Sequence, residues 1–138
     1  MTDQPRLVLV TGASRGIGRA AALHLARQGD LVIAIARSKA ALEKLDDEIR
    51  AMGSEAILVP MDLKDAKVIA DRFGRLDGFV ANAGILGTLG PLESAGPRSF
   101  EETIEVNLTA NWRLISVLSP SLRKSEAPRA VFVTSSVA

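Results

Sequence analysis

The sequence of 138 residues contains no cysteine, no tyrosine and only one histidine, His24. Without cysteine the chain forms neither disulfides nor thiolate metal sites, and one histidine cannot build a histidine cluster, so we expect no metal. No stretch approaches the roughly 18 apolar residues of a membrane-spanning helix. These absences exclude a disulfide scaffold and a cysteine or histidine metal centre, and they predict no membrane-spanning helix.

No sign of charge dominates either, because 17 basic and 16 acidic residues leave a formal net charge of +1. This balance predicts no nucleic-acid partner and no membrane-surface partner. Residues 1–6 lack the basic-then-apolar plan of a signal peptide, so we expect a cytoplasmic protein. The length predicts a single domain over residues 1–138, of ordinary globular composition with 47% hydrophobic residues.

Short apolar runs alternate with longer amphipathic stretches along the chain. This alternation predicts an α/β fold, a doubly wound parallel sheet of about five strands with helices on both faces. A glycine- and proline-rich loop is expected over 84–99, Ser38 and Ser99 are expected to be helix N-caps, and Ser119-Pro120 is expected to end or kink the last helix. The expected strands are 7–11, 31–36, 56–61, 78–81 and 131–133, and the expected helices are about 15–28, 39–52, 65–73 and 100–118.

A glycine-rich turn, Thr11-Gly-Ala-Ser-Arg-Gly-Ile-Gly18, lies between the first predicted strand and the first helix. Gly12 permits the tight exit from the strand, Gly16 lets the backbone approach a pyrophosphate, and Gly18 lets the helix pack close to the sheet. The N–H groups of the helix start at Ile17 attract the anion, and the Ser14 hydroxyl is a further donor. Because the turn lies in a strand–helix–strand unit at the start of an alternating chain, it predicts dinucleotide binding. It lacks the Lys-Ser/Thr ending of a P-loop, which argues against phosphoryl transfer.

The end of the second predicted strand bears on the choice between NAD and NADP. An acidic residue there would bind the ribose 2′-hydroxyl of NAD, but this chain has Ala36 followed by Arg37. Arg15 lies in the glycine turn on the same side of the site. Two guanidinium groups suit a 2′-phosphate, so the sequence favours NADP over NAD. The alternative is that both arginines are solvated surface residues.

Together these features resemble the short-chain dehydrogenase/reductase family. The turn from Thr11 to Gly18 and the segment Ala81-Asn82-Ala83-Gly84 are similar to two of its motifs, while Asn107 and Ser136 stand where the family keeps an Asn and its catalytic Ser. The resemblance implies a Rossmann-like sheet of strand order 3-2-1-4-5. It also implies an oxidoreductase that transfers a hydride between the nicotinamide and a small carbonyl or alcohol substrate.

The resemblance also implies roles for single residues. Ser136 would polarise the substrate oxygen, Asn107 would anchor a water of the proton relay, and Asp62 and the Leu63 N–H would bind the adenine. Asn82, with the Ala83-Gly84 backbone, would lie beside the cofactor ribose. Two alternatives stay open: Asp62 as a helix N-cap, and Asn82 as a tie between neighbouring strands.

The chain departs from the family in two ways. It contains no tyrosine, so the Tyr-x-x-x-Lys of the family is absent, and we expect a C-terminally incomplete chain that binds cofactor but does not turn over efficiently. The alternative is a catalytically inactive dinucleotide-binding or scaffold protein. The segment from Asp62 to Asn82 is also shorter than in the family, by about two helical turns, which means either a shortened helix or a missing segment.

The long predicted helix over 100–118 carries apolar residues at helical spacing. By resemblance, this helix with Trp112 would contact a second copy in a homo-oligomer. The alternative is that the whole stripe packs on the sheet, since one apolar face needs burial. The apolar positions are Ile104, Leu108, Trp112, Ile115 and Leu118.

Overall fold

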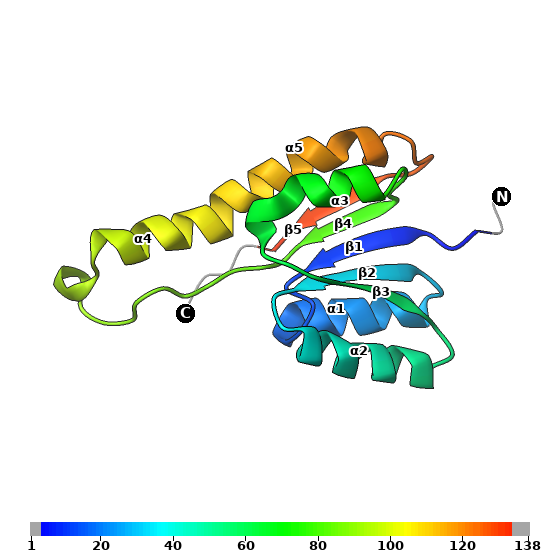
Figure 1. The fold of residues 1–138 in the computed structure, drawn as a ribbon, viewed down its shortest axis with the longest axis horizontal. Coiled ribbons are helices and arrows are strands. Elements are labelled where there is room, and N and C mark those ends of the chain that lie inside the picture. Colours follow the sequence, from blue (N-terminus) through cyan, green and yellow to red (C-terminus); the bar gives the residue numbers. More distant parts are fainter. Residues whose placement is uncertain (1–3, 134–138) are drawn as a thin grey trace.

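The computed structural model describes residues 4–133, except for the side chain of Ala66. Five parallel strands form one sheet in the order β3-β2-β1-β4-β5, which confirms the predicted architecture and strand order (Figure 1). The strands are β1 (Leu7–Thr11), β2 (Leu31–Ala36), β3 (Ala56–Pro60), β4 (Gly78–Ala81) and β5 (Arg129–Phe132).

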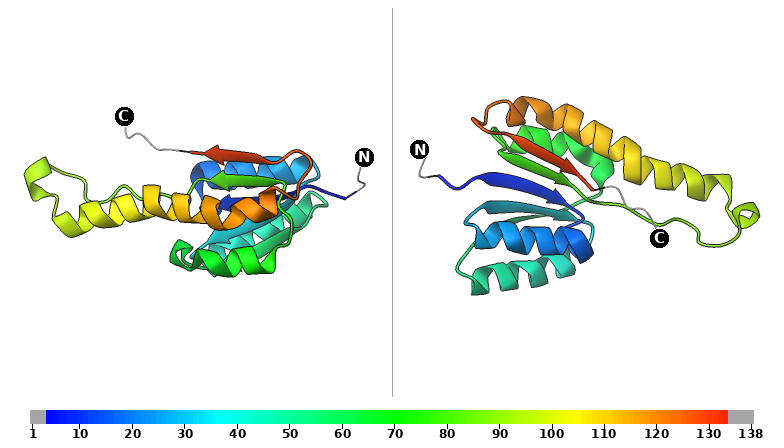
Figure 2. Two further views of the ribbon diagram at one scale, coloured as in Figure 1. Left: turned by 90° about the horizontal axis from the view of Figure 1, so that it is seen from above. Right: turned by 180° about the vertical axis from the view of Figure 1, so that it is seen from behind.

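Helices cover both faces of this sheet. The helices α1 and α2 lie on one face, and α3 and α5 lie on the other (Figure 1). The helix α4 continues through a π-helical turn into α5 and extends past the sheet (Figure 2). The helical elements are α1 (Gly16–Arg27), α2 (Lys39–Ala51), η1 (Leu63–Asp65), α3 (Ala66–Arg72), η2 (Leu92–Ser94), α4 (Pro97–Ile104), the π turn η3 (Glu105–Thr109) and α5 (Ala110–Leu122).

Each face of the sheet has its own hydrophobic core, because successive side chains of a strand point to opposite faces. In β1, Leu9 packs with Leu114 and Leu118 of α5. Its neighbour Val10 packs on the other side with Leu45 of α2. Burial on both faces explains why the strands read as continuous apolar runs and not as alternating ones.

Several predicted helix ends are confirmed. The Ser38 hydroxyl accepts a hydrogen bond of 3.2 Å from the N–H of Ala41 and so caps α2. Gly29 and Gly53 follow α1 and α2 with φ of 86° and 79°, a conformation that glycine adopts without steric cost. Within residues 4–133, no helix is long and apolar enough to cross a membrane.

The prediction that Ser99 caps a helix is wrong. The helix begins two residues earlier, at Pro97, whose fixed φ and missing N–H suit the first helical position. The Ser99 hydroxyl instead accepts a 2.9 Å hydrogen bond from the N–H of Thr88, which fastens the preceding loop to α4. The predicted loop is therefore shorter than 84–99 and is tied to the helix that follows it.

Of the two effects expected of Ser119-Pro120, ending the last helix is wrong, since α5 runs on to Leu122 with Pro120 inside it, while a kink stays a prediction. Proline removes its own N–H from the helical ladder, and its ring crowds the carbonyl four residues back. Tertiary contacts hold the last turn: the Ser121 hydroxyl donates 2.9 Å to the carbonyl of Phe73, and Leu122 is buried. The side-chain contact with α3 thus outweighs the local signal of the proline.

The alternative in which the whole apolar stripe packs on the sheet is wrong. Leu108 and Trp112 are 64% and 65% exposed, while Leu114 and Leu118 are fully buried. The π turn at Glu105–Thr109 holds more residues per turn than an α-helix, so it rotates the positions before it relative to those after it. In addition, α4 and the π turn extend past the sheet, beyond the ends of the five described strands (Figure 2).

Candidate functional site

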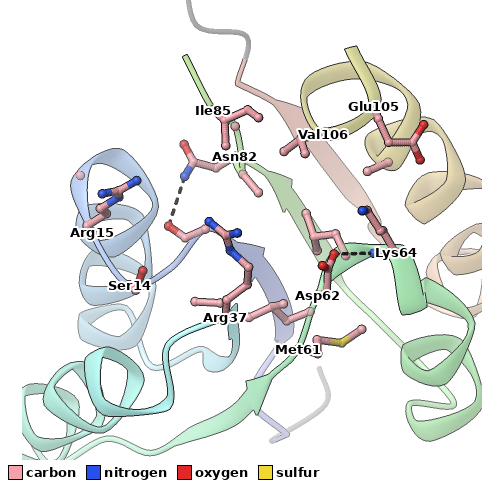
Figure 3. Close-up of a pocket in the computed structure, with 18 of the residues that line it drawn as sticks. Ser14, Arg15, Arg37, Met61, Asp62, Lys64, Asn82, Ile85, Glu105 and Val106 are labelled. Carbon is pink, nitrogen blue, oxygen red and sulfur yellow. Dashed lines mark hydrogen bonds between the residues drawn. The ribbon is translucent and has the colours of Figure 1, made fainter. Parts of the chain in front are cut away.

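The carboxyl ends of β1, β2, β3 and β4 surround a pocket of about 320 Å³ (Figure 3). The strand order reverses at β1, and in such sheets ligands bind in the crevice beyond the strand ends at this point. The pocket brings together ten of the residues predicted from sequence: Gly12, Ser14, Arg15, Gly16, Arg37, Asp62, Leu63, Asn82, Ala83 and Gly84.

The three glycines of the turn have different geometries. Gly12 and Gly16 have φ of 63° and 58°, which side chains rarely adopt. A Cβ atom on Gly18 would lie nearer than 3.0 Å to the carbonyl of Gly12 and to the amide of Asn82, so only glycine fits. A Cβ atom on Gly16 would meet no atom within 4 Å, which means that this side of Gly16 faces open space. The turn is therefore close-packed where Gly18 faces Gly12 and Asn82, and it is open at Gly16.

The start of α1 is open to an anion. Arg15 is the N-cap residue, but its side chain makes no capping hydrogen bond, and the first turn contains no acidic residue. The first N–H groups of a helix lack intrahelical partners and carry the positive end of the helix dipole. Because no side chain among residues 4–133 caps them, these groups suit a pyrophosphate.

Thr11 and Asn82 join the ends of β1 and β4. The Thr11 hydroxyl accepts hydrogen bonds from the N–H groups of Asn82 (2.9 Å) and Ala83 (3.1 Å). The side-chain amide of Asn82 donates to the carbonyl of Gly12 at 3.4 Å. The predicted alternative, that Asn82 ties neighbouring strands, is thus confirmed. The structural role of Thr11 was not predicted.

Three cations line the pocket. Figure 3 shows Arg15 at the start of α1 and Arg37 at the end of β2 on one side, with Lys64 on the other. None of the three forms a salt bridge with a carboxylate among residues 4–133. Ala36, the last residue of β2, is buried beneath this end of the pocket. The three charges remain available to an anionic ligand.

Asp62 and Leu63 lie where β3 leaves the sheet. The Asp62 carboxylate accepts a hydrogen bond of 3.1 Å from the N–H of Lys64 and so caps the short turn η1, as the predicted alternative requires. Both residues also line the pocket, and the capping bond engages one of the two carboxylate oxygens. Capping and ligand binding by Asp62 are therefore compatible.

Asn107 lies on the π turn and clamps the segment that follows β4. Its side-chain oxygen accepts from the N–H of Ile85, and its side-chain nitrogen donates to the carbonyl of Ile85, each at 2.8 Å. Asn107 and Ile17 line a larger, more open depression of about 1400 Å³ next to the pocket. Gly18 lies buried behind the pocket, and Ser136 lies outside the described residues.

Sequence reasoning missed several residues of the pocket. Lys64 directly follows the predicted pair Asp62-Leu63, so its position next to them was a usable signal. Glu102, Glu105 and Val106 come from α4 and the π turn, far along the chain, and no local pattern marks them. Among them, Glu105 is paired with Arg113.

The site and sheet together define a Rossmann-type dinucleotide fold, and sequence comparison places the chain more closely. The profile of the short chain dehydrogenase family matches residues 6–138, so the chain belongs to this family. It is 37% identical over 142 residues to a protein of Escherichia coli (strain K12) named "Uncharacterized oxidoreductase YciK", covering 96% of this chain and 56% of that protein. The chain thus spans about half the length of the curated relatives it matches.

Two further relatives are described with different cofactors. A putative short chain dehydrogenase from Shigella flexneri 2a (strain 301), solved in complex with NADP, superposes with a TM-score of 0.86 at 35% identity, over 92% of this chain and 57% of that one. An "Uncharacterized NAD-dependent oxidoreductase" of Mycobacterium tuberculosis (strain CDC 1551) is 33% identical over 153 residues, 96% of this chain and 55% of the relative.

Proposed function

We propose that this chain is the cofactor-binding part of an NADP-dependent oxidoreductase that acts on a small carbonyl or alcohol. When bound, a nicotinamide dinucleotide supplies or accepts the hydride. The residues of this chain bind and orient the dinucleotide. The observation that carries the proposal is the pocket at the strand ends, with an uncapped helix start and unpaired arginines at its rim.

The pocket fits a dinucleotide in shape and in donor groups. Its volume of about 320 Å³ lies within the usual range for ligand sites. Gly16 leaves open space in front of the α1 N-terminus, where a pyrophosphate would accept hydrogen bonds from the backbone. Asp62 and Leu63 at the other end would bind the adenine edge, and Ala83-Gly84 would lie beside the second ribose.

The choice of NADP over NAD rests on Arg15 and Arg37. Both are exposed, both line the pocket, and neither pairs with a carboxylate among residues 4–133. A guanidinium binds a phosphate through two parallel hydrogen bonds, which NAD cannot offer at its 2′-hydroxyl. The NADP complex of the Shigella relative supports this choice, and the name of the mycobacterial relative shows that the family fold alone does not decide it.

The experiment measures NADPH and NADH affinity of the wild-type chain and of a variant with both Arg15→Ala and Arg37→Ala. We expect the double variant to lose affinity for NADPH on the order of 100-fold, with NADH affinity nearly unchanged, because two charge-assisted contacts are lost. The variant Arg27→Ala removes an exposed arginine at the far end of α1 and serves as control. An equal loss for both cofactors, or none, would contradict the proposal.

Turnover needs more than the binding residues. Reduction of a carbonyl leaves an alkoxide-like oxygen that must be protonated. We assign Ser136 to polarising that oxygen and Asn107 to the proton relay, while the 138 residues include no tyrosine to act as the proton donor. The chain alone is therefore expected to bind NADPH without efficient turnover.

We also propose a homo-oligomer through the exposed apolar residues of the α4–α5 helix. Phe100, Ile104, Leu108 and Trp112 recur every four residues and are 66%, 40%, 64% and 65% exposed. Such a stripe is larger than the scattered apolar residues of an ordinary surface. Sedimentation should show that Trp112→Glu lowers the association of the chain, whereas Val68→Glu, at an exposed apolar residue on α3, leaves it unchanged.

A further inference from the structure

Asn111 is a buried polar residue that the proposed function does not use. It lies in the first turn of α5 and is 7% exposed, on the buried side of the helix from which Leu114 and Leu118 pack against the sheet. Its side-chain nitrogen donates a 2.8 Å hydrogen bond to the main-chain carbonyl of Asn107. Its side-chain oxygen is buried and has no hydrogen-bond partner among residues 4–133.

A carboxamide at this position costs free energy that an apolar side chain would not. Burial removes both polar atoms from water, and only one of them finds a partner in the described chain. Packing against the sheet does not require an amide, since Leu114 and Leu118 make those contacts without one. The retained interaction, the bond to the Asn107 carbonyl, is the specific feature of Asn111.

That carbonyl belongs to an irregular part of the helix. In the π turn the N–H of Ala110 bonds to the carbonyl of Glu105, five residues back, so the regular four-residue ladder is interrupted. A side-chain donor one turn further on supports the backbone where the ladder changes. Asn111 provides this donor, and it does so at the residue whose own side chain clamps the backbone of Ile85.

The Asn107 side chain in turn fixes the wall of the site. It holds both polar backbone groups of Ile85, and a Cβ atom on Gly84 would lie only 3.1 Å from its oxygen. Gly84 and Ile85 both line the pocket. The placement of this wall therefore depends on the Asn107 amide, and the placement of the amide depends on the backbone of the π turn.

We infer that Asn111 is a positioning residue, which holds the main-chain carbonyl of Asn107 so that the Asn107 side chain stays aligned with Ile85 at the wall of the cofactor pocket. The inference rests on the proposed function, because that function makes the pocket a cofactor site. Asn111 acts through Asn107 and is not assigned any contact with cofactor or substrate.

Two substitutions of nearly equal shape test this. In Asn111→Thr the hydroxyl can donate to the carbonyl four residues back, as helical threonines do, whereas Asn111→Val has the same shape and no donor. Hydrogen exchange of the Ile85 N–H is the first readout, with the N–H of Val10 in β1 as reference for global opening. Titration of each chain with NADPH is the second readout.

We expect Asn111→Val to speed exchange at Ile85 by about fivefold relative to Val10, as loss of one hydrogen bond predicts, and to weaken NADPH binding by a few-fold. Asn111→Thr should stay within about twofold of the wild type in both. Equal behaviour of the two variants, or an Asn111→Val chain with wild-type exchange at Ile85, would overturn the inference.

Two provisions keep the test decisive. If Asn111→Val does not fold, the pair Asn111→Ser and Asn111→Ala makes the same comparison with smaller side chains. If the wild-type chain binds no NADPH, the proposed function fails, but the exchange comparison at Ile85 still decides whether Asn111 positions Asn107. The two failures are therefore distinguishable.

Discussion

The side of the sheet where its strands begin, here called the amino edge, differs from the side where they end, the carboxyl edge, in whether charged side chains are paired. At the amino edge, where the strands begin, the carboxylates of Asp30 and Asp77 are paired. Arg6 donates two hydrogen bonds, of 2.9 and 2.8 Å, to the buried carboxylate of Asp30. Asp77 accepts 2.8 Å from the N–H of Leu7 and 2.6 Å from the Ser125 hydroxyl, and it pairs with Arg75.

At the carboxyl edge, where the strands end, the cations are left unpaired. Arg15, Arg37 and Lys64 line the pocket without a salt bridge among residues 4–133. The charged groups at the amino edge thus join strands, while the cations at the carboxyl edge keep their capacity for a ligand, although Thr11 and Asn82 join β1 to β4 there as well. Substitutions of charged side chains at the two edges should therefore separate stability from binding.

The largest effect is expected from Gly18→Ala, which disrupts the packing of the glycine turn at the carboxyl edge. The new Cβ atom would collide with the backbone of Gly12, so α1 must shift away from the sheet. We expect a loss of about 3 kcal/mol in the free energy of unfolding and of NADPH binding on the order of 100-fold. Urea unfolding and NADPH titration measure the two, and Gly74→Ala, which meets no atom within 4 Å, is the control. Wild-type binding by Gly18→Ala would contradict the assigned packing.

The next effect concerns the amino edge alone. Asp77→Asn removes a charge that three groups contact: the Leu7 N–H of β1, Arg75 in the loop before β4 and the Ser125 hydroxyl in the turn before β5. We expect it to lower the free energy of unfolding by about 1–3 kcal/mol, the usual range for hydrogen bonds to a charged group, without changing NADPH affinity. Asp71→Asn, at an exposed position on α3, should change neither quantity. A change in NADPH affinity for Asp77→Asn would show that the edges are coupled.

The same aspartate should give the stability a pH dependence. Burial by itself would raise the pKa of Asp77, but the hydrogen bonds from Ser125 and Leu7 and the charge of Arg75 hold the pKa below its ordinary value of 3.8. The stabilisation is therefore complete above that ordinary value and is lost as the pH falls through the lower folded-state pKa. Urea unfolding of wild type and Asp77→Asn between pH 7 and pH 2 should show the difference between them shrinking only at the acid end.

The smallest effect is expected from the binding arginines on stability. Because Arg15 and Arg37 are exposed and unpaired among the described residues, replacing both with alanine should change the free energy of unfolding by less than about 0.5 kcal/mol. Thermal unfolding of the double variant without cofactor measures this. A clear destabilisation would mean that the arginines serve the fold and would weaken the contrast between the edges.

Much of the carboxyl edge could be predicted from the sequence because its requirements are local. Gly12 and Gly18 are required by the tight backbone geometry of one turn. The continuous apolar sequence of β1 and β2 indicates that these strands are buried. Arg15 and Arg37 follow from their place beside those elements. Ten predicted residues accordingly line one pocket.

The remainder depends on contacts between segments that are distant in the sequence. The π turn, the course of α5 past Pro120 and the exposure of Trp112 are set by how α4 and α5 meet the sheet. Neither hydrophobic spacing nor capping rules contain that information. The same holds for Asn111, whose buried amide is recognisable only once the carbonyl of Asn107 lies beside it.

The preference for NADP is tested most directly by calorimetric titration of the 138-residue chain with NADPH and with NADH at the same salt concentration. We expect both to bind at one site and NADPH to bind more tightly by at least about tenfold, because the 2′-phosphate would contact Arg15 and Arg37. Tighter binding of NADH, equal binding of the two, or no binding of either would contradict it.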